Sequence, residues 1–243
     1  RRIFKNLDAT LGGPLDQLHS DIARIGKGNF GDAIHVAPGM HDSVLGWLAQ
    51  TQRQLNEMEH ARSASDAKLR RLTQLYAALS ECNQAVVRCT NDQDLFDSIC
   101  RAAVEQGGMR TAWIGSVDWQ SHVIRPVASY GVGTQHLGDI HIVVDSDQPT
   151  GRGPSGIAAR EDQPFWCQDY QGEAITASWH ALGKELGWAA SAALPLHRDG
   201  RVVGLLNVYA GEVNAFDDKV RNLLLEMASD MDYALRNFDR EAA

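Results

Sequence analysis

Apolar residues in the first third of the chain recur at steps of three and four, as on one stripe of a helix. Pro14 can open this helix, and glycines between residues 26 and 31 end it. Apolar periodicity resumes in a second helix that begins near Ser43. A connector of about 15 residues is long enough to run back along the first helix. We therefore expect two parallel helices.

Two short helices cannot bury their apolar stripes within one chain, whereas a homodimer would bring four of them together as a parallel bundle. The second helix keeps this spacing beyond Leu55, which favours a coiled coil over a solvated linker helix with a salt-bridged face. Arg62 and Ser65 are poor seam residues, so they predict the weakest part of the coil. The predicted dimer seam consists of Leu15, Leu18, Ile22, Ile25, Leu48, Leu55, Leu69, Leu72, Tyr76 and Leu79.

The remaining two thirds of the chain change to runs of aromatic and β-branched residues separated by polar turns, which predict strands. A helix over 92–105, capped by Asn91 or Asp92, precedes them. The expected strands cover 111–118, 123–129, 140–144, 165–168, 190–196 and 201–209, and a last helix covers 217–238. This order is typical of an α+β fold with a central antiparallel sheet, helices on one side and crossover loops over a pocket on the other.

Composition and charge exclude some classes of binding partner and indicate the cellular compartment. The net charge of -8 provides no basic stripe for nucleic acid. The four cysteines match neither a zinc site nor a disulfide framework, which indicates a reducing compartment. No run of about 18 apolar residues is present, yet Arg1, Arg2 and Lys5 open the sequence without a methionine. We expect the cytoplasmic portion of an inner-membrane protein, cut just after a membrane helix; an arbitrary boundary within a soluble protein is the alternative.

Three features invite a chemical interpretation. The glycine-rich residues 151–156 lack the Gly-Lys-Ser/Thr of a phosphate-binding loop, so we interpret them as a loop that opens a helix, with Arg152 as a candidate anion contact. His136 and His141 lack a metal-site spacing and are expected at the surface. Cys167 lies in a predicted strand, where we expect a small buried apolar residue rather than bilin attachment or redox catalysis. We assign no catalytic residue and no metal ligand.

Short motifs in the first third share the order and spacing of a known relay module. They are Pro14-Leu15, Gly28-Asn29-Phe30 and Gly46-x-Leu48, followed by Leu55 and Met58. Residues 14–58 thereby resemble a HAMP domain. HAMP domains usually carry an Asp-Glu pair before the second helix, where this chain has Ser43-Val44. A plain helical hairpin is the alternative.

A second set of motifs lies in the last two thirds. These are Thr111-Ala112-Trp113-Ile114-Gly115, Arg125-Pro126-Val127-Ala128-Ser129, Gly151-Arg152-Gly153-Pro154-Ser155-Gly156, Ala193-Leu194-Pro195-Leu196 and Val203-Gly204-Leu205-Leu206-Asn207-Val208-Tyr209. Together they make residues 69–238 resemble a GAF domain, particularly the group that precedes GGDEF domains in bacterial cyclic-di-GMP signalling proteins.

The GAF resemblance implies a ligand pocket beneath a covering helix. Its candidate residues are Trp113, Tyr130, Asp169, Trp179 and Ser191, although core packing is an equal alternative for each tryptophan. The Asn-Lys-x-Phe-Asp-Glu signature of cyclic-nucleotide-binding GAF domains is absent. The pattern therefore predicts a possible small-molecule ligand but identifies neither that ligand nor any cofactor.

Both resemblances together imply one domain order. Residues 1–13 would end a membrane-proximal helix, 14–58 form the HAMP domain, 59–79 form a coiled-coil signalling helix that runs into the GAF domain at 69–238, and 239–243 begin a linker to a missing output domain. The chain would be the non-enzymatic sensory portion of a dimeric signalling protein whose output makes or hydrolyses cyclic di-GMP. Two alternatives stay open: a redox enzyme similar to free methionine sulfoxide reductase, and a GAF dimerisation spacer without ligand.

Overall fold

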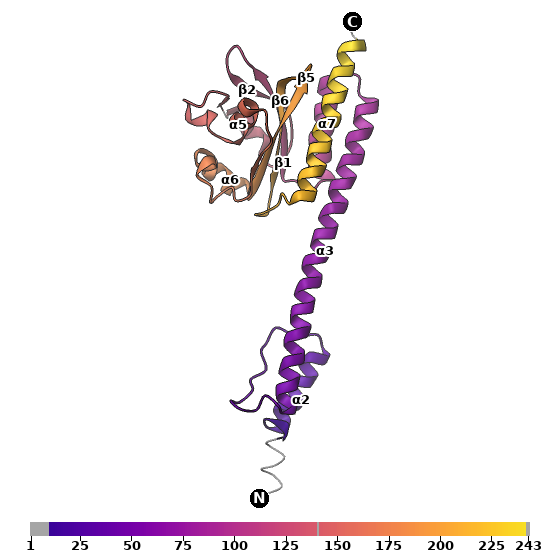
Figure 1. Cartoon of the computed structure of the whole chain (residues 1–243), viewed down its shortest axis with the longest axis vertical. Coiled ribbons are helices and arrows are strands. Elements are labelled where there is room, and N and C mark those ends of the chain that lie inside the picture. The colour runs from indigo at the N-terminus through magenta and orange to yellow at the C-terminus, as the bar shows by residue number, and fades with distance from the viewer. Residues whose placement is uncertain (1–9, 140, 242–243) are drawn as a thin grey trace, which may run out of the picture. The chain divides into compact units, whose positions relative to one another are not determined.

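The computed structural model describes residues 10–139 and 141–241 (Figure 1). The chain forms two compact units, residues 1–69 and residues 70–243, and the long helix α3 (Val44–Arg88) contributes to both. Most of the membrane-proximal helix expected at 1–13, and the end of the linker expected at 239–243, lie outside the described residues. No helix in the described part of the chain is apolar over a stretch long enough to cross a membrane.

The first unit contains α2 (Leu15–Gly26) and the start of α3, as the sequence predicted. Ser43 caps α3, because its hydroxyl oxygen accepts a hydrogen bond from the Gly46 amide at 3.1 Å and donates one to the Met40 carbonyl at 2.6 Å. A small core lies between the helices and the connector. It contains Leu18, Ile34, Leu45 and Ala49, with Leu11, Ile25, Val36, Val44 and Leu48 packed against it.

The second unit is built on a six-stranded antiparallel sheet with strand order β3-β2-β1-β6-β5-β4. Its strands are β1 (Thr111–Asp118), β2 (Val123–Gly131), β3 (Ile142–Val143), β4 (Phe165–Cys167), β5 (Ala190–Arg198) and β6 (Arg201–Ala210). This arrangement confirms the predicted α+β class. The expected strand at 140–144 is wrong in extent, because β3 pairs only with Val123 and Ile124 before the chain leaves the sheet edge.

Each face of the sheet carries its own apolar core. On one face lie α4 (Asp92–Glu105) and α7 (Asp218–Glu241), and the last turns of α3 lie beside α7 (Figure 1). On the other face lie α5 (Pro154–Glu161), α6 (His180–Leu186) and the short 3-10 helices η1 (Thr134–Asp139), η2 (Pro149–Gly151) and η3 (Ala174–Trp179). The side expected to carry crossover loops therefore also carries helices. The segment from η3 to α6, which contains Trp179, was expected only as a covering helix without stated bounds.

Burial within one chain corrects part of the predicted seam. Leu18 lies in the core of the first unit and Leu79 in the core of the second, each 7% exposed, so neither is available to a second copy. Leu79 packs inward because this end of α3 shares an apolar core with α4 and α7. Ile25, Leu48, Leu55 and Leu72 are half-buried, whereas Leu15, Ile22, Leu69 and Tyr76 are exposed.

Candidate functional site

A pocket lies on the face of the sheet that α5 and α6 cover. Strands β1, β5 and β6 supply its floor with Trp113, Ser191 and Asn207, and the N-terminal turn of α5 supplies Ser155. Neighbouring strands place these side chains on one face, because Trp113 pairs with Asn207 across β1 and β6. The remaining lining residues are Leu137, Ile142, Thr150, Gly153, Pro154, Gly156, Tyr170, Trp179, Trp188, Ala192 and Tyr209.

Buried polar side chains converge on this pocket. The Ser155 hydroxyl donates to Oδ1 of Asn207 at 2.8 Å, which fixes the orientation of the Asn207 amide. The amide nitrogen of Asn207 then has one long contact, 3.4 Å, to the Leu205 carbonyl. The Ser191 hydroxyl is buried and forms no hydrogen bond that meets ordinary geometry, although it lies opposite Cys167 in the strand register. Two donor groups are thus available to a ligand.

Aromatic rings fill one end of the pocket. Trp188 and Tyr209 stack with ring centroids 4.0 Å apart, and Tyr170 meets both rings edge-on at 5.9 Å. The indole nitrogens are satisfied, because Trp188 donates to the Thr111 hydroxyl at 2.9 Å and Trp113 to the Tyr209 hydroxyl at 3.3 Å. These rings brace one another and form a rigid wall.

The covering layer nearly closes the pocket. Space for the centre of a water molecule amounts to about 20 Å³, which is room for about one water. The Trp179 ring lies so close to Gly153 that a Cβ atom there would meet it at 2.3 Å. Arg160 of α5 joins segments of this layer, because its guanidinium donates to the carbonyls of Val144, Gly151 and Gly156. A molecule larger than water must therefore displace part of the cover.

Three of the five predicted pocket residues, Trp113, Trp179 and Ser191, line the cavity. Tyr130 does not, because it lies one residue out of phase on β2, packs toward the helical face and donates to the Glu105 carboxylate. Asp169 is exposed and accepts a hydrogen bond from the Gly172 amide in a turn. Ligand binding by any of the five stays a prediction.

Sequence reasoning missed Ser155, Tyr170, Trp188, Asn207 and Tyr209. One signal was available: Asn207 is a polar residue inside the otherwise apolar run of β6, and Tyr209 follows it on the same face. The position of Ser155 beside Asn207 could not be predicted, because 52 residues separate the two.

Cys167 is fully buried on the pocket side of the sheet, as expected for an apolar role. Burial, and then the negative charge of Glu173, raises its pKa to about 12, while the nearby Ser191 hydroxyl opposes the rise. A thiol with this pKa is almost wholly protonated at neutral pH and is a poor nucleophile. Cys82, Cys89 and Cys100 pack with the core on the opposite face, so none of them can pair with Cys167.

The other candidate contacts are occupied or dispersed. The Arg152 guanidinium donates to the carbonyls of Ser146 and Asp147, away from the pocket lining. His136 lies half-buried in η1, and His141 is exposed. Among the described residues, no group of three or more His, Cys, Asp or Glu side chains is arranged to hold a metal.

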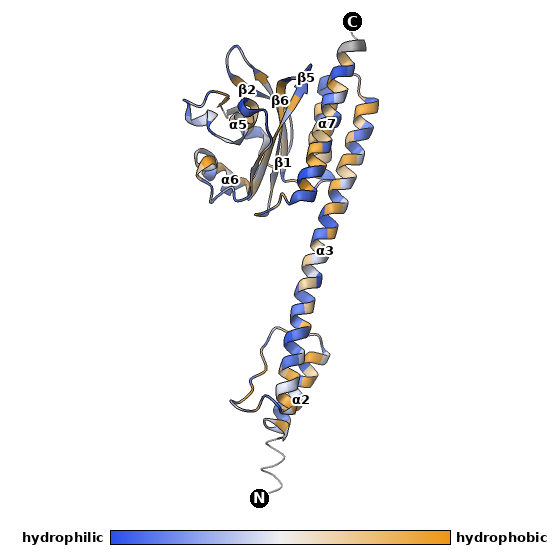
Figure 2. Ribbon diagram, viewed as in Figure 1, coloured by the Kyte–Doolittle hydropathy of each residue, from blue (hydrophilic) through white to orange (hydrophobic). Residues whose placement is uncertain are grey.

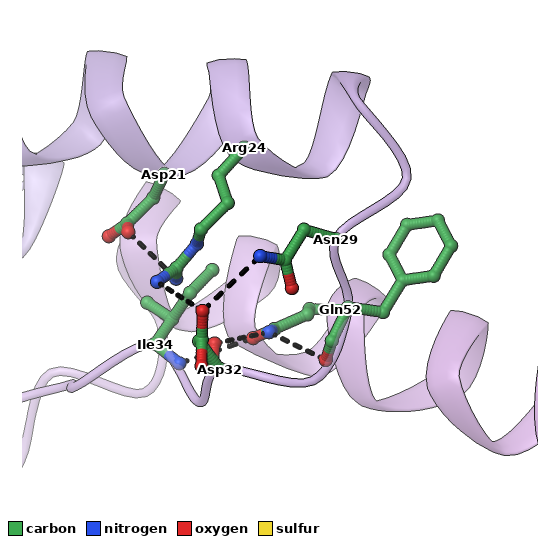
Figure 3. Close-up of polar contacts among 7 residues, drawn as sticks. Asp21, Arg24, Asn29, Asp32, Ile34 and Gln52 are labelled. Atoms are coloured by element: carbon green, nitrogen blue, oxygen red, sulfur yellow. Dashed lines mark hydrogen bonds and ion pairs between the residues drawn. The ribbon is translucent and has the colours of Figure 1, made fainter.

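A second polar cluster lies in the first unit (Figure 3). Gln52, only 2% exposed, accepts a hydrogen bond from the Ile34 amide at 3.2 Å and donates to the carbonyls of Phe30 at 2.9 Å and Asp32 at 2.6 Å. Its side chain thus fastens the connector to α3. Arg24 pairs with Asp21 at 3.0 Å and with Asp32 at 3.9 Å, which links α2 to the same connector.

Comparison with known proteins agrees with this fold. A family profile described as GAF domain matches residues 89–236, more than half of the chain, and the chain belongs to the GAF family. No curated protein matches the sequence.

Solved structures with this fold include three that match most of their own length. The GAF domain of a phosphoenolpyruvate-protein phosphotransferase from Coxiella burnetii is 14% identical, with a TM-score of 0.57 over 70% of this chain and 98% of that one. The corresponding Acinetobacter domain is 11% identical, with a TM-score of 0.54 over 69% and 96%. Free methionine-R-sulfoxide reductase from Neisseria meningitidis is 18% identical, with a TM-score of 0.56 over 70% and 92%. At these identities the likeness shows the fold alone.

Proposed function

We propose that this chain is the sensory and regulatory portion of a membrane-anchored bacterial signalling protein. In this proposal residues 14–58 form a HAMP relay, residues 59–79 form a coiled-coil signalling helix, and the GAF domain senses a small molecule. The output would be a C-terminal domain that makes or hydrolyses cyclic di-GMP, and the chain itself would have no catalytic activity. Its working form would be a parallel homodimer.

One observation carries this proposal: α3 bears a line of exposed apolar side chains. Its five large exposed apolar residues are Trp47, Met58, Leu69, Tyr76 and Val87, each 61% exposed or more. They are separated by 11, 11, 7 and 11 residues. Since each residue turns an α-helix by about 100°, all five lie within about 40° of one another. Figure 2 shows such hydrophobic positions recurring among hydrophilic ones along α3.

A second copy of α3 is the partner that fits this line. The line runs for 40 residues, from Trp47 to Val87, or about 60 Å along the helix axis. Two copies in register would set each apolar side chain beside its own counterpart about a twofold axis. Ser65 and Asn83 share the face between these residues and are uncharged, so no like charges would oppose one another in the seam.

The first unit supports the same pairing. Leu15 and Ile22, seven residues apart on α2, are 65% and 50% exposed, and Trp47 on α3 is 61% exposed. Apolar residues left outside a core on both helices are what a four-helix bundle made by two copies would cover. The Gln52 contacts would keep the connector in place in each copy.

The helical layer of the GAF domain supplies a path for a signal. The C-terminal part of α3 packs directly on α7, where the Cys82 thiol approaches the Met227 carbonyl at 3.9 Å, and α7 in turn packs on β5 of the sheet that floors the pocket. A ligand would alter this path only through its different affinity for two packings of the helices.

Charge placed in the seam tests the proposal. Leu69→Glu combined with Tyr76→Glu is expected to convert a dimer into a monomer in sedimentation equilibrium, because four buried carboxylates would face one another. Ala67→Glu is the matched control, since this exposed residue lies on the opposite face of α3, and that variant should remain dimeric. A wild-type monomer at high concentration, or a dimeric double variant, would contradict the proposal.

The two alternative functions have less support. A redox enzyme similar to free methionine sulfoxide reductase would need a reactive thiol, and Cys167 is buried, has a raised pKa and has no second cysteine on its side of the sheet. A ligand-free spacer would have little use for a buried Ser191 hydroxyl that forms no hydrogen bond of ordinary geometry beside a cavity.

A further inference from the structure

The pocket lining has no charge. None of the fifteen described residues that line it is Asp, Glu, Lys, Arg or His. Two charged groups on the same side of the sheet are engaged elsewhere: Arg160 donates to three backbone carbonyls, and Glu173 accepts from the amides of Gln168 and Asp169. A charged ligand would lose its hydration in this nearly closed space without gaining an opposite charge.

The uncharged polar groups in the pocket suit a ligand that carries a neutral hydrogen-bond acceptor. Ser155 holds Oδ1 of Asn207, so the amide nitrogen of Asn207 is the part of that side chain available for a new bond. Ser191, 3% exposed and with only the Cys167 thiol as a weak side-chain partner, offers a hydroxyl on the adjacent strand. A carbonyl oxygen that accepts from both would satisfy these buried donors.

The apolar part of the pocket favours a flat partner. Trp113 lines the pocket from the strand floor and Trp179 from the covering layer, and Leu137 and Ile142 add apolar surface. Planar rings stack on indole faces and gain more than their area alone provides. The braced cluster of Tyr170, Trp188 and Tyr209 also lines the pocket.

We propose that this pocket binds a small, planar, uncharged molecule that carries a carbonyl or carboxamide group. The inference rests on the proposed sensory function and names the ligand class of that site. Asn207 and Ser191 would hold the carbonyl oxygen, and Trp113 and Trp179 would enclose the ring. Binding would lift the part of the cover that carries Trp179.

Three nearly isosteric probes separate charge from shape: neutral benzamide, anionic benzoate and cationic benzamidine. Nitrogen-15 NMR of the tryptophan indoles reports where each probe binds. Benzamide is expected to shift the indole signals of Trp113 and Trp179. The signals of Trp47 on α3, and of Trp119, which donates to the Val202 carbonyl in a turn, should stay in place. Benzoate and benzamidine are expected to bind at least about tenfold more weakly.

Two variants test the contacts. Ser191→Ala removes one hydroxyl from a strand already rich in alanine, and Asn207→Leu replaces the amide by an apolar side chain with the same branching and number of heavy atoms. Each should weaken benzamide binding in calorimetry, Asn207→Leu by about tenfold. Ser116→Ala, on the exposed part of β1, is the control and should bind as the wild type does.

Benzoate or benzamidine binding as tightly as benzamide would overturn the inference, as would benzamide binding that neither variant weakens. Absence of binding by all three probes would also overturn it and would favour the ligand-free spacer. None of these results affects the sedimentation test of the dimer, which uses no ligand, so failure of the ligand class and failure of the proposed function are distinguishable.

Discussion

The Nδ1 atom of His197 lies 2.7 Å from a carboxylate oxygen of Asp232, and its Nε2 atom lies 2.7 Å from Asp162. Asp232 belongs to α7, and Asp162 is the left-handed residue that ends α5. His197, near the end of β5, therefore joins the helix whose first turn lines the pocket to the C-terminal helix on the opposite face. Both ring nitrogens face carboxylates, which favours the doubly protonated imidazolium.

This bridge predicts a pH dependence of stability. Burial alone would lower the pKa of His197, but the hydrogen bonds and charges of Asp162 and Asp232 outweigh it and raise the pKa. The stability gained is therefore complete below the unfolded pKa of about 6.5 and is lost as the pH rises through the raised value. His197→Gln should lower the free energy of unfolding more at about pH 6 than at about pH 9.

Asp232, itself part of the bridge, affects stability at lower pH. Burial raises the pKa of Asp232, against the hydrogen bonds from His197 and the charge of Arg236. The contribution of this carboxyl to the free energy of unfolding therefore decreases as the pH rises above its ordinary pKa of 3.8. His141→Gln, at an exposed histidine of the same domain, is the control. Equal losses for His197→Gln at both pH values in urea denaturation would contradict the charged bridge.

Thiol accessibility gives a second prediction. Cys82, Cys100 and Cys167 are buried, and desolvation raises the pKa of Cys100 and of Cys167 to about 12, whereas Cys89 is partly exposed. Iodoacetamide should therefore label Cys89 first in the folded protein, and the other three only after denaturation. Peptide mass mapping of the labelled protein determines the order in which the cysteines react. Rapid native labelling of Cys167, or methionine sulfoxide reduction that Cys167→Ser abolishes, would restore the redox alternative.

The connector of the first unit provides a third prediction. Gln52→Leu removes hydrogen bonds to one buried amide and two carbonyls, each of which costs about 1 to 3 kcal/mol when left unsatisfied. The Ile34 amide should then exchange with solvent at least about tenfold faster, as measured by hydrogen–deuterium exchange. Gln54→Leu, at an exposed position two residues away, should leave that exchange unchanged. If the exchange rate of the Ile34 amide is unchanged in Gln52→Leu, the Gln52 hydrogen bonds do not hold the connector on α3.

Local signals predicted much of the fold. Helix α4 begins and ends as expected because Asn91 accepts a hydrogen bond from the Asp94 amide, a cap readable in sequence. Strand β1 also matches, since a polar turn separates it from β2. The short edge strand β3 and the segment from η3 to α6 depend on contacts with distant residues. For example, the carbonyl of Gly187, which caps α6, accepts a hydrogen bond from Arg110, so local patterns did not define this segment.

The pocket was predictable only in part for the same reason. Trp113 stands out as an aromatic residue on a strand, but Tyr130 could be assigned to the opposite face only once its pairing with Ala112 was known. Leu79 fits the seam by spacing, yet α7 packs in the same core and the GAF domain buries it. Periodicity indicates which residues share a face of a helix but not which partner covers that face.

Intermolecular cross-linking at Met58 tests lengthwise pairing most directly. In a Cys89→Ser background, where the remaining native cysteines are buried, Met58→Cys should form covalent dimers rapidly under mild oxidation, because parallel copies in register bring equivalent residues together. His60→Cys, an exposed position on the opposite face of α3, should cross-link slowly. Slow cross-linking at both positions, or equal rates at both, would contradict the paired α3 helices.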